Sequence, residues 1–320
     1  NKDGSVPVDF DLTERKPRSI KFGFGYSTDL GPGASAGWEH RNFFGSGEKV
    51  TANLFGNKRE QTLDIGLVKP FFQRDDQTLK LGLALENLIS KAYSSREGTV
   101  SAFVEREFSP AFTVGIGSSI AHAAIKGREE KKWTYASLFS APVFFTHDTR
   151  SNILDPIGGH EIRTEFTPFF NSHEKTKPFA KAQISASTYF LVPTVMSPVI
   201  AVRAATGSIF DVKLDTLPYT ERFFVGGAGS LRGYVPQMAS KLTSANNPIG
   251  GRSFLETSIE LRLRATESIG IVGFFDSGFA YPEKIIPLKN QKILHGAGIG
   301  FRYVTDFGPL RFDLAFPLKR

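Results

Sequence analysis

Strict alternation of apolar and polar residues runs through most of the chain, and it constrains the fold more than any other feature. In residues 254–264, Leu255 and Ile259 fall at odd positions, whereas Glu260 and Arg262 fall at even positions. Successive side chains of a β-strand point to opposite faces. This segment therefore predicts a strand with one apolar face and one charged face. Helical periodicity, by contrast, is hard to find in this sequence.

The same pattern predicts fifteen strands, many of them separated by turn signals such as Gly45-Ser-Gly47 and Asp155-Pro-Ile-Gly-Gly159. The expected strands span residues 19–28, 34–43, 47–58, 61–71, 77–90, 98–108, 111–126, 132–147, 160–170, 177–191, 198–210, 252–265, 268–281, 292–305 and 308–318.

Strand length and number favour a transmembrane β-barrel over a soluble all-β protein, which would also alternate. The expected strands are close to the ~9–11 residues that cross a bilayer at a tilt. Their number exceeds that of one typical sandwich, and their polar faces carry closely spaced Glu and Arg, as a polar lumen would. Aromatic residues near strand ends, including Tyr26, Trp38 and Tyr281, match interfacial girdles. We expect an all-β, transmembrane antiparallel barrel.

The composition argues against nucleic acids and metals as partners. The net charge is +7, but the basic residues are scattered in runs of at most two, whereas nucleic-acid binding needs a concentrated stripe. The chain has no Cys, and its six His show no metal-site spacing. We expect no cofactor and no metal.

One string, Gly33-Ala-Ser-Ala-Gly37, matches the Gly-x-Ser-x-Gly pattern of hydrolases. That elbow requires a strand before the serine and a helix after it. Here a turn precedes the string and an alternating strand follows, so we interpret Ser35 as an ordinary residue at a strand start. An outer-membrane hydrolase remains the enzymatic alternative, and we expect the chain not to be an enzyme.

The first residues differ from the rest. The stretch from Val6 to Thr13 alternates and is followed by Glu14-Arg-Lys-Pro17. We interpret residues 1–18 as the last strand of a preceding domain plus a linker. The chain starts at Asn1 without a charged segment and an apolar stretch after it, so it shows no signal peptide and resembles an internal piece of a longer protein.

Three motifs carry a resemblance to a known family. The glycine-rich stretch Phe224-Val-Gly-Gly-Ala-Gly-Ser-Leu-Arg-Gly-Tyr234, the string Phe275-Asp-Ser-Gly278 and the segment Gly308-Pro-Leu-Arg-Phe-Asp-Leu-Ala315 together resemble the Omp85 superfamily of outer-membrane assembly barrels, which contains BamA and TamA. The opening, with Gly25-Tyr-Ser-Thr-Asp-Leu-Gly-Pro32, is most similar to the TamA branch, the barrel subunit of the translocation and assembly module.

The resemblance implies a 16-stranded barrel in the bacterial outer membrane, spanning residues 19–320 here and preceded by POTRA-like periplasmic domains. In the family the arginine loop is extracellular, joins strands 11 and 12 and folds into the barrel. Eleven expected strands precede Phe224 and four follow it. The family pattern would therefore need a sixteenth strand after Arg320, so either this sequence is cut short or the last strand lies outside it.

The resemblance also implies a site within the inward-folded loop, residues 212–251. By analogy, Arg232 should pair inside the lumen with acids on the next two strands, Glu260 and Asp276. A guanidinium cannot be deprotonated in a protein and needs carboxylates where it leaves water. A solvated arginine on a mobile loop is the alternative. Gly226, Gly227, Gly229 and Gly233 suit positive φ or close approach to a wall, and Gly233 and Tyr234 complete the latch motif.

The implied function is insertion of β-rich outer-membrane proteins, such as autotransporters, without ATP. Residues 19–28 would be a lateral-gate strand whose edge templates incoming strands; Gly23 and Gly25 face inward and would weaken the seam. The named gate residues are Ile20, Phe22, Gly23, Phe24, Gly25 and Tyr26. Expected partners are unfolded client proteins, the lipid bilayer and a periplasm-spanning protein. A passive pore and a two-partner-secretion-type polypeptide transporter are the alternatives.

Overall fold

The computed structural model describes residues 16–27, 31–171, 177–194, 196–266, 268–287, 289, 292–305 and 308–318. Most of the expected N-terminal domain end and linker, residues 1–15, lies outside the described residues.

The described chain is almost entirely β-strand, which confirms the all-β prediction. One 3-10 helix, η1 (Tyr219–Glu221), is the single helical element in the described ranges. The strands are β1 (Arg18–Ser27), β2 (Gly31–Arg41), β3 (Lys49–Asn57), β4 (Glu60–Pro70), β5 (Gln77–Ile89), β6 (Tyr93–Ser109), β7 (Phe112–Gly127), β8 (Thr134–Ser140), β9 (Val143–Asp148), β10 (Gly159–Asn171), β11 (Phe179–Leu191), β12 (Val199–Phe210), β13 (Ser253–Arg264), β14 (Ile269–Tyr281), β15 (Leu294–Thr305) and β16 (Gly308–Pro317).

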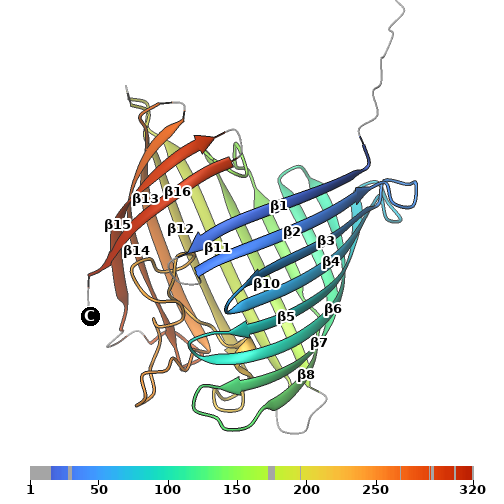
Figure 1. Cartoon of the computed structure of the whole chain (residues 1–320), viewed down its shortest axis with the longest axis vertical. Helices are drawn as coiled ribbons and strands as arrows, with labels where there is room; N and C mark the ends of the chain where they lie inside the picture. Colours follow the sequence, from blue (N-terminus) through green and yellow to red (C-terminus); the bar gives the residue numbers. More distant parts are fainter. Residues whose placement is uncertain are drawn as a thin grey trace, which may run out of the picture.

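All sixteen strands belong to one antiparallel sheet in which neighbours in sequence pair with each other (Figure 1). The fifteen expected strands become sixteen because residues 132–147 form two strands, β8 and β9. Both pair with β7 on one side and with β10 on the other. Pro142 lies between them and has no N–H for the ladder, although its carbonyl accepts a hydrogen bond from Gly117 N at 2.9 Å. β8 and β9 are therefore two halves of one interrupted strand, and β16 is the fifteenth expected strand.

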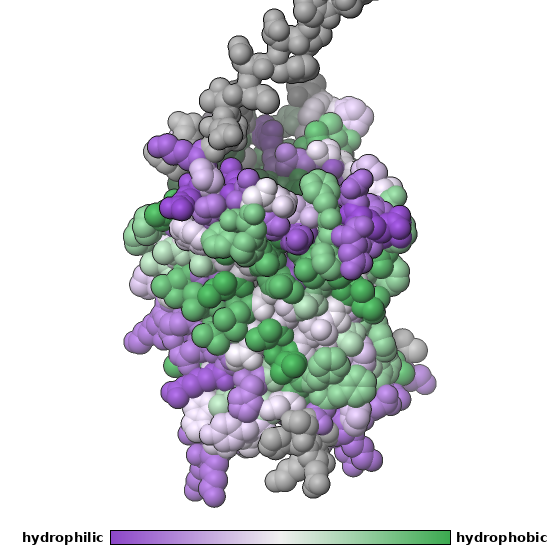
Figure 2. Space-filling view, turned by 90° about the vertical axis from the view of Figure 1, so that its right-hand side faces the viewer, coloured by the Kyte–Doolittle hydropathy of each residue, from purple (hydrophilic) through white to green (hydrophobic). Residues whose placement is uncertain are grey.

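The alternation places apolar side chains outside and polar ones in the lumen. Leu81 and Leu83 on β5 are exposed on the outer face, whereas Lys80, which precedes Leu81, pairs inside with Glu105 at 2.6 Å. Figure 2 shows hydrophobic side chains gathered in a band between more hydrophilic ends. Among the described residues, no helix is long and apolar enough to cross a membrane.

The two ends of the sheet differ from its interior. β1 pairs with β2 over its whole length, and β16 pairs with β15. Within the part of the chain that the structure describes, neither β1 nor β16 has a second strand partner. Among the described strands, β1 and β16 are therefore the two edge strands of the sheet.

Candidate functional site

The segment between β12 and β13, residues 211–252, packs against the inner faces of the strands. Leu217 and Phe223 join a buried cluster with lumen-facing side chains such as Phe179 and Ile209. Val225 and Leu231 are fully buried in a second cluster beside β14. The backbone joins the wall as well.

Two backbone contacts fix this path. Ala280 N donates to Ala239 O at 2.9 Å, and Ser240 forms an isolated parallel bridge with Ala280. Inside the lumen, these bonds pair backbone groups of β14 with backbone groups of the irregular loop that need hydrogen-bond partners. The glycine-arginine stretch is thereby held at a fixed position on the wall.

The structure brings Arg232 into contact with both acids expected from the sequence. Its Nε lies 2.6 Å and its Nη2 2.8 Å from the two carboxylate oxygens of Asp276, the paired geometry that a guanidinium suits best. Its Nη1 lies 2.8 Å from Glu260 Oε1. The backbone N of Arg232 also donates to Asp276 Oδ2 at 3.2 Å.

Other side chains complete this arginine site. Arg232 Nη2 donates to Ser258 Oγ at 3.2 Å, and Ser258 donates to Asp276 Oδ1 at 2.7 Å. The guanidinium carbon lies 3.5 Å from the centre of the Phe274 ring, a favourable cation–π position. Asp313 on β16 lies 3.7 Å from Arg232 Nη1. The arginine thus contacts three separate strands.

The charges around Arg232 affect its pKa more than its burial does. Its side chain is 11% exposed and that of Asp276 is 1% exposed. Burial alone would lower the pKa of the Arg232 guanidinium, but the hydrogen bond to Asp276 and the charges of Asp276 and Glu260 hold this pKa above its usual value. Losing one partner of such a pair leaves an uncompensated buried charge, which costs about 3–5 kcal/mol.

The acids are themselves shared with further arginines. Glu260 also accepts a bond from Arg262 Nε at 2.9 Å, and Asp313 accepts one from Arg302 Nη1 at 2.5 Å. Positive and negative groups thus alternate from β13 through the loop to β16 and β15. We call Arg232, Glu260, Asp276, Ser258 and Asp313 the arginine network.

The glycines of the loop have different reasons to be glycine. Gly226, Gly227 and Gly233 have φ of 117°, 97° and 91°, a region that L-residues rarely adopt. A Cβ on Gly233 would also lie 3.0 Å from the carbonyl carbon of Phe316. The expectation for Gly229 is wrong: its φ is not positive, and a Cβ there would meet open space.

Tyr234 and Gly233 place the loop against the last strands. Tyr234 Oη donates to the carbonyl of His295 at 3.2 Å, and that carbonyl also accepts a bond from Leu318 N at 2.8 Å. A Cβ on Gly296 would collide with the carbonyl of Arg232. The loop tip therefore rests on the backbone of β15 and β16.

A second polar region lies at the start of the loop. Arg222 donates to the carbonyls of Leu217 at 3.0 Å and Ile249 at 2.9 Å, so it closes the base of the loop. Burial lowers the pKa of Arg222. Glu221 lies 3.8 Å from Lys181 on β11, and burial raises the pKa of Glu221.

The expected gate strand lies at the sheet edge. Ile20, Phe22, Phe24 and Tyr26 point outward, and Phe24 is 89% exposed. Gly23 lies opposite Ser35 in the register with β2, and a Cβ on Gly25 would meet nothing within 4 Å. On the lumen side of β1, Lys21 Nζ lies 3.9 Å from Glu39 Oε2 and a Cβ on Gly23 would meet the Ser35 hydroxyl, while the two glycines contribute no side chain of their own.

The structure does not assemble an enzyme or metal site around the residues considered from sequence. Ser35 lies inside β2 rather than at its start, and no helix follows it. In the described ranges, no group of three His, Asp or Glu could hold a metal ion. His147 and His160 do approach, with Nδ1 and Nε2 3.0 Å apart, a contact that sequence spacing missed because it forms across the β9–β10 pair.

The sequence also missed part of the arginine network. Asp313, Ser258 and Phe274 were not named as site residues. Parity could have found Asp313 and Ser258, because Asp313 lies on the polar face of its strand with Arg311, and Ser258 shares the polar face of β13 with Glu260. Nothing in the spacing says which of these lumen groups a loop arginine will reach.

An apolar outer band, a polar lumen and a loop anchored inside that lumen define a bacterial outer-membrane β-barrel. A model of the Omp85 superfamily domain matches residues 42–320. The chain therefore belongs to the Omp85 superfamily.

Known proteins agree with that assignment. The outer membrane protein assembly factor BamA of Nitratidesulfovibrio vulgaris is 25% identical over 347 residues, which covers 99% of this chain and 41% of that protein. The crystal structure of BamA from Haemophilus ducreyi lacking POTRA domains 1–3 matches with a TM-score of 0.83 at 17% identity, over 96% of this chain and 68% of that one. CdiB from Escherichia coli matches with a TM-score of 0.68 at 14% identity, over 96% and 60%. The chain spans about two fifths of the length of the N. vulgaris relative.

Proposed function

We propose that this barrel assembles β-rich outer-membrane proteins, and that it does so at the edge of β1 without enzymatic chemistry or a cofactor. The observation that carries the proposal is the make-up of β1, an edge strand of the described sheet with an exposed apolar outer face and two glycines on its lumen face. Unpaired backbone groups in hydrocarbon cost several kcal/mol each. A client strand that adds to this edge removes that cost, which is the physics of β-augmentation.

The side chains of β1 support this role. Its outer face is apolar and broad, with Phe22 and Phe24 available to lipid or to a neighbouring strand. On its lumen face, Gly23 and Gly25 offer no side chain to lock a partner. An edge of this kind can pair and release through its backbone, because little side-chain interlocking has to be broken.

The arginine network supports a complementary role as a latch. Arg232 joins the loop to β13, β14 and β16, which keeps one wall rigid while the other end of the sheet exchanges partners. We propose that Arg232, Gly233, Tyr234, Glu260 and Asp276 act in this way and make no direct contact with the client.

The branch of the family, the kind of client and the partner protein are proposed from the sequence and the relatives. The opening at Gly25–Pro32 supports the TamA branch and autotransporter-type clients, whereas the match over 99% of this chain is to a BamA. A periplasm-spanning partner would act through domains that precede β1. Nucleic acid has no role in this proposal.

Site-directed crosslinking tests the gate. The chain has no native Cys, so single cysteines at Lys21 and Phe24 on β1 report cleanly, with Phe145 on β9 as an exposed control on a distant strand. The proteins are placed in liposomes and offered an unfolded outer-membrane protein that carries one cysteine in its last strand. We expect disulfide adducts at β1 and few at Phe145. Adducts confined to Phe145 would contradict the gate.

The likeness to CdiB favours one second candidate, export of a polypeptide through the lumen. Export requires the buried loop to leave, whereas strand insertion at β1 does not. Cysteines at the bridged pair Ser240 and Ala280 would lock the loop to β14. An oxidised variant that still inserts clients excludes export, and a variant that regains activity only after reduction supports it.

A further inference from the structure

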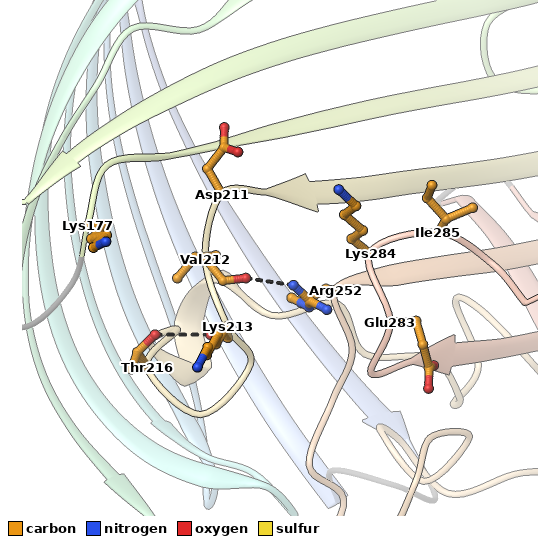
Figure 3. Close-up of a pocket in the computed structure, with 9 residues that line it drawn as sticks. All are labelled: Lys177, Asp211, Val212, Lys213, Thr216, Arg252, Glu283, Lys284 and Ile285. Carbon is orange, nitrogen blue, oxygen red and sulfur yellow. Dashed lines mark hydrogen bonds between the residues drawn. The ribbon is translucent and has the colours of Figure 1, made fainter.

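A cavity of about 790 Å³ lies at the rim of the barrel, where β12 and β14 end and β13 begins. It is lined by four basic side chains, Lys177, Lys213, Arg252 and Lys284, and by two acidic ones. Figure 3 shows that these side chains come from four segments that surround one hollow. The cavity therefore carries an excess of positive charge.

The basic side chains of the cavity differ in whether they already have bonding partners in the protein. Arg252 is held by the carbonyls of Pro282 at 2.9 Å and Val212 at 2.7 Å, so it fixes the shape of the rim. Within the described ranges, no carboxylate lies within ion-pair distance of Lys177, Lys213 or Lys284. These ammonium groups are free to meet a ligand.

The register shows that one lining segment of this cavity, Glu283 to Ile285, lies against the outer face of the sheet. A Cβ on Gly207 would meet Phe223 of the lumen loop, so the next residue, Ser208, faces outward. Ser208 donates through its hydroxyl to the carbonyl of Lys284. Ser253, its partner in the ladder, donates to the carbonyl of Glu283 at 2.9 Å. The segment after β14 thus crosses the outside of β12 and β13.

A second, mostly apolar hollow of about 500 Å³ continues from the first and shares Lys284 and Ile285 with it. It runs over outward residues of β11 and β12, among them Ala182 and Ile184, and is bordered by Ile286. Basic and apolar hollows therefore meet at one short segment on the side of the barrel that faces lipid.

We propose that the two hollows form one binding site for a membrane lipid whose headgroup carries a phosphate. Lysine ammonium groups bind phosphate as compact point charges, and the apolar hollow takes an acyl chain. A soluble anion would use the basic hollow alone. The continuity of the apolar groove with the basic hollow, through Lys284 and Ile285, identifies the lipid.

Lipid binding to the purified full chain in dodecyl maltoside, followed by native mass spectrometry, tests the charged half. Phosphatidylglycerol is the probe and phosphatidylcholine the reference. We expect the Lys213→Gln/Lys284→Gln variant to lose roughly thirtyfold in affinity for phosphatidylglycerol, on the order expected for two basic residues at an anionic surface. Heat-modifiable migration on gels checks that the variant is folded, and loss of that migration would indicate misfolding.

The matched control is Lys131→Gln/Lys132→Gln. Both lysines are exposed in the turn after β7, at the same end of the barrel, since Glu129 of that turn accepts a bond from Asn247 of the loop. The control removes the same charge outside the cavity and should keep wild-type affinity. An equal loss in the control, or equal binding of the two lipids by wild type, overturns the proposal.

Two measurements separate a lipid from a free anion. Ile285→Ser should weaken phosphatidylglycerol binding several-fold, because Ile285 is 65% exposed and lines both hollows. Inorganic phosphate at low millimolar concentration should not displace the lipid. Displacement by phosphate together with an unaffected Ile285→Ser variant would assign the cavity to a soluble anion and overturn the lipid site.

Discussion

The wall of β12–β14 and the edge strand β1 share the same alternating sequence pattern, yet the wall is held by ion pairs and a covering loop and the edge strand is not. In the wall, the lumen-facing Glu260 and Asp276 are both engaged by Arg232, and a loop covers the surface. At the edge, Gly23 and Gly25 occupy two of the lumen-facing positions of β1, and one side of the backbone has no strand partner among the described residues. The difference shows that the alternating pattern determines which residues form the barrel wall. The contacts of the lumen side chains determine which part of that wall is held in place.

The largest expected effect is loss of the arginine network. Arg232→Glu brings a fourth carboxylate beside Asp276, Glu260 and Asp313, and removal of one partner from a buried ion pair already costs about 3–5 kcal/mol. We expect the loop to leave the wall and client insertion to fall. Limited proteolysis within residues 226–234 and an insertion assay measure both.

The control for that change is Arg264→Glu. Arg264 pairs with Asp155 in an exposed position at the barrel end, where an ion pair contributes little. It should retain both loop protection and activity. If Arg232→Glu keeps its loop and its activity as well, the latch is wrong and both regions of the barrel depend on the sheet alone.

A smaller effect is expected for Gly233→Ala. Its φ of 91° and the nearby carbonyl carbon of Phe316 leave no room for a Cβ, and a residue forced into such backbone costs about 1–3 kcal/mol. Gly229→Ala, in the same loop but with open space around it, should be nearly silent. Thermal unfolding of the two variants in detergent compares them. Equal shifts in Tm would mean that the loop tip does not rest on β16.

The smallest effect concerns the edge. Gly25→Val fills empty space on the lumen side of β1 and strengthens the strand by roughly 0.5–1 kcal/mol. If a weak strand favours exchange, client insertion should slow about two- to fivefold while the barrel stays folded. Gly56→Val on β3, which also has open space, provides the control. Faster insertion with Gly25→Val, or equal slowing in both variants, would argue against a gate at β1.

Sequence predicted much of the site because of parity and because of motif resemblance. Parity put Glu260 on the polar face of its strand, and the resemblance supplied its pairing with Arg232. The resemblance did not supply Asp313 or Phe274, because the long side chain of a loop arginine can reach many lumen groups. It misjudged Gly229, because a glycine-rich string does not tell which of its members carries positive φ.

Local alternation determined the strands, their faces and the membrane-facing surface, because a strand's side-chain period is a property of the backbone alone. Even the division of residues 132–147 has a local cause, in Pro142. Only tertiary structure decided which groups meet: Arg232 with three strands, His147 with His160, and Lys284 with the outer face of β12. Those contacts depend on the closure of loops over long sequence separations, and no local pattern encodes the distance between such groups.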